Sequence, residues 1–106
     1  MVTAQEIQAG FELARQAGVE MYSRVGERDA CGFGWVDVQV ERTNSKQAQE
    51  LVKAGFRKSY RPKTMTFWDP AGVPTQSISV KEAGAEALAT YLTALGLKAY
   101  AGSRMD

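Results

Sequence analysis

Apolar residues recur at helical spacing in three stretches of the chain, and each stretch follows a polar residue that can cap a helix. Each cap has a Glu or Gln three residues later, the arrangement of a capping box. The three predicted starts are Thr3-x-x-Glu6, Asn44-x-x-Gln47 and Ser79-x-x-Glu82. Glycine tolerates the backbone that closes a helix, so glycines mark the predicted ends. These ends are Gly18 or Gly26 for the first helix, Gly55 for the second and Gly96 for the third.

Residues 31 to 40 alternate in character instead, which predicts a strand with two different faces. Glycine and valine fill one face, whereas Phe33, Trp35 and Asp37 lie on the other. Residues 56 to 68 are extended but contain Pro62, which cannot donate to a sheet. They form either an edge strand or a hairpin that turns at Arg61-Pro62-Lys63. A short last strand is predicted at residues 97 to 101.

This order of helices and strands predicts the α+β class. We expect three helices packed on a mainly antiparallel sheet of three to four strands. No linker or repeat interrupts the chain, so residues 1–106 are expected to form a single domain.

Charge is unevenly distributed, although the formal net charge is only +1. Residues 42 to 63 contain seven basic residues and one acid, and residues 1 to 41 contain seven acids and three arginines. A basic segment of this kind favours contact with an anionic partner, which can be a nucleic acid or an acidic protein surface.

The chain has no histidine and a single cysteine, Cys31. The commonest general base and transition-metal ligand is therefore missing, and Ser-His or Cys-His catalysis is excluded within this chain. We expect no enzymatic activity, no metal and no cofactor, with Cys31 as a small buried apolar residue. The lone cysteine, the absence of a signal peptide and the absence of a membrane-spanning apolar run favour a cytoplasmic location.

The segment Cys31-Gly-Phe-Gly-Trp-Val-Asp-Val38 resembles the RNP1 stretch of the RNA-recognition motif. In that family, alternate aromatics on a sheet stack on bases, which makes Phe33 and Trp35 a candidate aromatic platform. The chain departs from this family in two ways. Cys31 replaces the basic residue of the motif, and no strand is predicted ahead of the first helix, although that fold requires one. The alternative is that Phe33 and Trp35 belong to the core or lie beneath a helix, with Gly32 and Gly34 marking a bulge or a close helix approach.

A second candidate site follows at residues 57 to 63, where basic residues alternate with an aromatic one and Trp68 lies just beyond. Cations follow phosphates and rings stack on bases, so the pattern is typical of single-stranded nucleic-acid binding. Lysines and arginines also protect edge strands from aggregation, and they can hold an acidic protein. The candidate partner-binding residues are Arg57, Lys58, Tyr60, Arg61, Lys63 and Trp68.

The C-terminal third, from Val80-Lys-Glu-Ala-Gly-Ala to Ala99-Tyr-Ala-Gly-Ser-Arg-Met-Asp106, resembles the ends of small proteins encoded by bacteriophages and prophages. The short segments Ala54-Gly-Phe56 and Phe67-Trp-Asp-Pro70 show the same resemblance. It implies an accessory protein that binds a host macromolecule, for example a defence-system component such as a CRISPR effector.

We therefore expect a non-enzymatic, phage-type protein that modulates or inhibits a host protein or nucleoprotein complex through its basic and aromatic surface. The alternative is a single-stranded nucleic-acid-binding protein that uses the aromatic platform together with residues 57 to 63. Either a monomer or a homodimer is compatible with the sequence.

Overall fold

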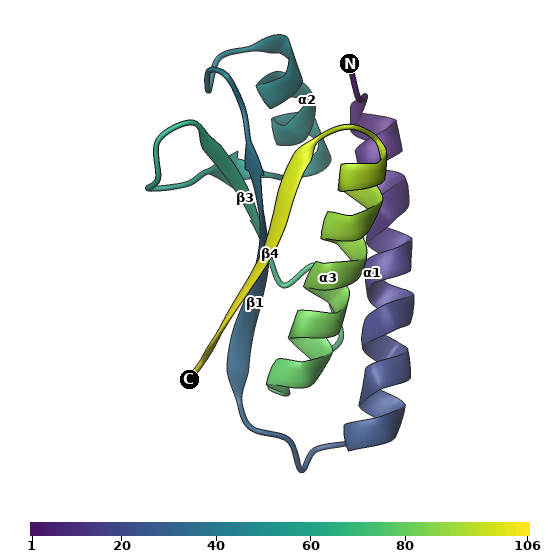
Figure 1. Ribbon diagram of the computed structural model, residues 1–106. Helices are drawn as coiled ribbons and strands as arrows, with labels where there is room; N and C mark the ends of the chain where they lie inside the picture. The colour runs from purple at the N-terminus through teal and green to yellow at the C-terminus, as the bar shows by residue number, and fades with distance from the viewer.

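Seven elements follow one another in the computed structural model, which describes residues 1–106 (Figure 1). They are α1 (Ala4–Val25), β1 (Gly32–Gln39), α2 (Lys46–Ala54), β2 (Arg57–Lys58), β3 (Thr64–Trp68), α3 (Ile78–Ala94) and β4 (Lys98–Met105). The three helices pack on one four-stranded antiparallel sheet, so the predicted α+β domain is confirmed. None of the helices has the length and apolar character that crossing a bilayer requires.

The sheet has the strand order β2-β3-β1-β4, with β1 and β3 in the centre. From β1 onward the chain runs strand, helix, strand, strand, helix, strand. Helices α2 and α3 each connect two parallel strands that have an antiparallel strand between them. This is the split β-α-β topology of ferredoxin-like folds, and α1 is an addition in front of it.

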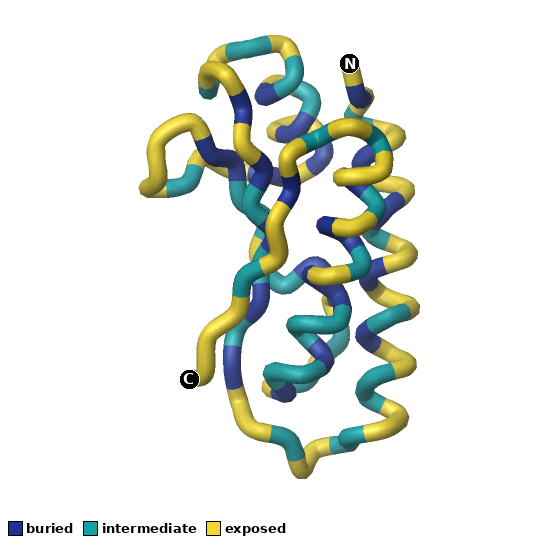
Figure 2. The backbone as a smooth tube through the Cα atoms, in the orientation of Figure 1, coloured by how far each residue is buried: buried dark blue, intermediate teal, exposed yellow.

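The core lies between the sheet and the helices, on one face of the sheet only. Val36, Val38 and Met65 point into it from the strands, and they meet buried leucines of α2 and α3. Along α1, buried and exposed stretches alternate, as expected of a helix with one covered side (Figure 2). The chain therefore buries one side of its sheet and leaves the other side uncovered.

Two glycines of β1 bring α3 close to the sheet. A Cβ atom on Gly34 would lie 2.8 Å from the Lys81 carbonyl oxygen, and one on Gly32 would lie 2.6 Å from Ile78 Cδ1. Neither position has room for a side chain, so the close helix approach considered for these glycines is confirmed.

The predicted starts of two helices are wrong by one and two residues. The N-cap of α2 is Ser45, not Asn44, and the N-cap of α3 is Ser77, not Ser79. At α3, Asp29 stabilises the observed start, because its Oδ2 accepts hydrogen bonds from Ser77 Oγ at 2.6 Å and from the Ser79 N–H at 2.8 Å. A carboxylate 48 positions from the cap thus helps to hold the start of α3 in place.

The ends of two further elements also depend on tertiary contacts, which the sequence pattern does not reveal. Helix α1 passes through Gly18 and ends at Gly26, because buried Gly18 leaves space for Ala71 rather than closing the helix. Strand β4 continues to Met105 instead of ending at residue 101. It pairs with β1 along its whole length, from Lys98 opposite Gln39 to Met105 opposite Gly32.

Candidate binding surface on the open sheet face

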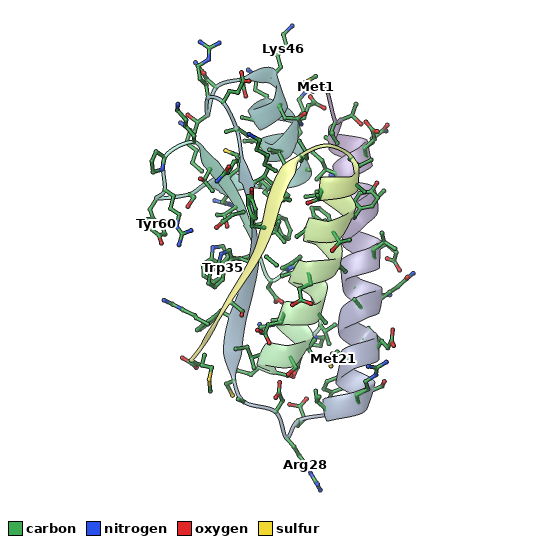
Figure 3. The ribbon with its side chains drawn as sticks, in the orientation of Figure 1. Met1, Met21, Arg28, Trp35, Lys46 and Tyr60 are labelled. Atoms are coloured by element: carbon green, nitrogen blue, oxygen red, sulfur yellow. The ribbon has the colours of Figure 1, made fainter.

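The face of the sheet turned away from the helices carries the aromatic residues of β1. Phe33, Trp35 and Asp37 are half-buried there, and Figure 3 shows Trp35 and Tyr60 on the side of the sheet away from α1 and α3. The predicted two-faced strand is confirmed. The alternative that a helix covers Phe33 and Trp35 is wrong, because Gly32 and Gly34 bring α3 to the opposite face.

Cross-strand register arranges this open face in rows, since residues directly opposite each other in antiparallel strands share a face. Each row contains one residue of β1 and its partners on the neighbouring strands. The rows are Arg104-Phe33, Gly102-Trp35-Trp68 and Tyr100-Asp37-Thr66-Arg57. The register therefore brings the two candidate sites predicted from the sequence onto one surface.

Three aromatic side chains form a cluster at the centre of this surface. The rings of Trp35 and Trp68 lie 4.8 Å apart at 37°, and the ring of Phe33 meets Trp68 edge-on at 6.3 Å. Trp68 leaves 52% of its surface in contact with solvent. The cluster thus offers aromatic faces to a partner without any rearrangement of the backbone.

Strand β4 contributes three residues that sequence reasoning missed. Gly102 lies beneath the Trp35 indole, Arg104 places its guanidinium 5.3 Å from the Phe33 ring centroid, and Tyr100 is 55% exposed. No local pattern marks these residues, because they join the surface only through pairing with β1.

The turn between β2 and β3 adds a cation and a ring above the sheet. Tyr60 is 90% exposed, and its hydroxyl accepts a hydrogen bond from Arg61 Nε at 3.3 Å. Arg61 also reaches Asp37, with 4.0 Å between its terminal nitrogen and the carboxylate. The hydrogen bond with Tyr60 is the main cause that raises the pKa of Arg61, and the guanidinium stays charged.

Aromatic, acidic and basic groups meet in a hollow of about 230 Å³. Its lining residues come from all four strands and from the β2–β3 turn. They are Trp35, Asp37, Lys58, Ser59, Tyr60, Arg61, Thr66, Trp68 and Arg104. Five of the eight residues predicted from the sequence therefore border one hollow, and Phe33 adjoins it through its contact with Trp68.

Arg57 and Lys63 lie outside that hollow. Arg57 is exposed on edge strand β2, in the same row as Asp37. Lys63 borders a larger and more polar hollow of about 660 Å³ at the end of the sheet, together with Lys98 and Gln39. Gln39 and Lys98 are opposite each other on the open face, so this second hollow adjoins the same surface, and its lining also includes the acid Glu41.

Cys31 is exposed, so its predicted burial is wrong. The residue directly precedes β1, where its side chain falls on the open face of the alternation and not on the helix side. No group of three or more histidine, cysteine or acidic residues is placed to hold a metal ion.

The chain matches no protein-family model, no curated protein and no solved structure.

Proposed function

We propose that this protein binds single-stranded nucleic acid on the open face of its sheet. The observation that carries the proposal is the cluster of Phe33, Trp35 and Trp68 on an uncovered sheet surface rimmed by arginines. The uncovered sheet face leaves this aromatic cluster partly in water, with Trp68 52% exposed, which is typical of a binding site.

Stacking supplies the first part of the interaction. A base stacked on a protein aromatic ring contributes about 1–3 kcal/mol, and it does so for every base because each one has a flat π face. Trp68 is the most accessible ring of the cluster, and Tyr60 extends from the neighbouring turn at 90% exposure. Bases in a duplex are already stacked on each other, so this contribution favours single strands.

Cations at the rim supply the second part. Arg57, Arg61 and Arg104 lie around the aromatic cluster, in positions where they can meet the phosphates that connect stacked bases. Arg104 already lies over Phe33, an arrangement that holds a guanidinium at the edge of an aromatic surface.

Titration of tryptophan fluorescence with single-stranded RNA and DNA oligonucleotides, at low and physiological salt, tests the proposal. We expect salt-dependent quenching, and weaker binding to a duplex of the same length. The double variant Arg57→Glu/Arg61→Glu should lose binding while keeping its thermal unfolding midpoint. A folded double variant that binds as tightly as the unmodified protein contradicts the proposal.

A second candidate is the function expected first from the sequence, occlusion of a host protein or nucleoprotein surface. The composition of the hollow favours it, because Trp, Tyr and Arg are the residues most enriched at energetic centres of protein interfaces. The two candidates differ in a competition experiment. If single-stranded oligonucleotides release a host protein that was retained from lysate, the host protein and the nucleic acid bind the same surface. If a host protein is retained but no oligonucleotide binds, the result supports protein binding alone.

A further inference from the structure

Strand β4 forms an outer edge of the sheet, and half of its backbone hydrogen-bonding groups point away from the protein. The N–H of Asp106 donates to the carbonyl of Cys31 at 3.1 Å, which fixes the phase of the ladder between β1 and β4. Bonded pairs alternate along an antiparallel ladder, so the even-numbered residues of β4 bond to β1. The N–H and C=O groups of Ala99, Ala101, Ser103 and Met105 therefore point outward.

The two edges of the sheet differ in their protection. Edge strand β2 has two residues, both basic and exposed, and it leads directly into the turn that contains Pro62. These features block strand addition. Strand β4 has eight residues and no proline, and the outward-pointing residues Ala101, Ser103 and Met105 are exposed. The Ala99 carbonyl accepts a hydrogen bond from the Thr93 hydroxyl at 3.4 Å.

The side chains of β4 are complementary to those of the same strand in a second copy. An antiparallel pair centred on Gly102 places Lys98 opposite Asp106 and Tyr100 opposite Arg104, all on the open face. The same register places Met105, which is 69% exposed, opposite Ala99. It also pairs outward-pointing residues with outward-pointing residues, as a hydrogen-bonded ladder requires. A pair centred on Ala101 instead sets Lys98 against Arg104, two like charges.

We propose that two copies of this chain associate through β4, in antiparallel register, with Gly102 on the two-fold axis. Opposite charges and a cation–π pair select this register. The association joins two four-stranded sheets into one of eight strands, with both aromatic clusters on the same continuous face. It does not require bound nucleic acid, because its contacts are formed by β4 and Asp106 of the two copies.

Sedimentation equilibrium of the purified protein without nucleic acid, up to about 1 mM, measures this association directly. We expect a concentration-dependent dimer. Ala101→Pro removes an outward N–H and leaves the ladder to β1 intact, so it should weaken dimerisation by at least about tenfold. Lys58→Pro is the matched control at the opposite edge, because the bond from Ser59 N–H to the Thr64 carbonyl shows that the Lys58 N–H also points outward. It should leave dimerisation unchanged.

Charge reversal tests the register. Lys98→Glu and Asp106→Lys each set like charges against each other, and each should weaken the dimer by about two- to thirtyfold. The double variant Lys98→Glu/Asp106→Lys restores both pairs and should recover the original affinity. A protein that stays monomeric throughout, a dimer insensitive to Ala101→Pro, or a double variant as weak as the singles overturns the proposal.

Discussion

The indole of Trp35 lies directly over Gly102 of the neighbouring strand. A Cβ atom at position 102 would lie 2.5 Å from both Cε2 and Nε1 of the ring, so only glycine leaves the indole in place. The same indole meets the Trp68 ring at 37°, so a change in its position would alter this pair of rings.

Replacing Gly102 by Ala should therefore displace the Trp35 indole and lower the free energy of unfolding by about 1–3 kcal/mol, the usual effect of overpacking. Near-UV circular dichroism reports the changed tryptophan pair, and thermal unfolding reports the stability. The neighbouring change Ala101→Ser points away from the indole, and it should alter stability by no more than about 0.5 kcal/mol. Identical near-UV spectra for Gly102→Ala and the original protein contradict the contact.

Trp68 should contribute to binding more than to folding, since half of it is exposed. We expect Trp68→Ala to reduce oligonucleotide affinity by about 1–3 kcal/mol, the value of one stacked base, in fluorescence anisotropy with a labelled single strand. Trp68→Phe keeps an aromatic face and should retain most of the affinity. Leu13→Ala removes a comparably exposed apolar side chain from α1, 44% exposed, and should leave the oligonucleotide affinity unchanged. Equal losses for the Ala and Phe variants rule out stacking.

The arginines of the open face should determine how steeply binding depends on salt. For single strands, each phosphate contact contributes about 0.7 to the slope of log K against log salt concentration. Changing Arg57, Arg61 or Arg104 to Gln should each reduce the slope by about that amount. Arg15 and Arg24 on α1 pair with Glu12 and Glu20, and their Gln variants are matched controls. If the control variants reduce the slope by the same amount, the effect comes from net charge alone, and the predicted phosphate contacts are contradicted.

Asp29 makes stability sensitive to acid. The hydrogen bond from the Ser77 hydroxyl, followed by that from the Ser79 N–H, lowers the pKa of Asp29 from 3.8 to about 2. A group whose pKa is lower in the folded state stabilises the protein above its unfolded pKa, and this contribution disappears as the pH falls from about 3.8 to about 2.

Asp29→Asn should therefore be less stable than the original protein at neutral pH, and the difference should narrow between pH 4 and pH 2. Chemical denaturation at a series of pH values measures it. Glu27→Gln, two residues earlier and exposed, should show a much smaller effect in this window. A stability difference that is constant with pH would exclude the carboxylate as its source.

Cys31 should be reactive and dispensable for folding. Because the residue is exposed, a thiol reagent should modify it in the native protein without denaturant. Cys31→Ser should change the free energy of unfolding by no more than about 0.5 kcal/mol. A thiol that reacts only after unfolding would contradict this exposure.

The local sequence determined those elements whose starts, turns or faces depend only on residues that are neighbours in the sequence. The alternation of residues 31 to 40 predicts both faces of β1, because side chains of a strand point alternately to opposite sides. The turn at Arg61-Pro62-Lys63 follows from proline chemistry, and it is the β2–β3 turn of the structure. The helix at Thr3 follows from its capping box, which is present with both of its hydrogen bonds.

Tertiary structure decided which face of the sheet is covered and what the open face contains. Gly32 and Gly34 could admit a helix on their side, but only the packing of α3 left Phe33 and Trp35 uncovered. Asp29 bonds to the N-cap of α3 from 48 positions away. Residues 102 to 105 carry too little local preference to form a strand alone, and β1 recruits them by pairing along its whole length. Contacts between distant residues are invisible to local patterns, so Arg104 and Gly102 entered the candidate site only through the fold.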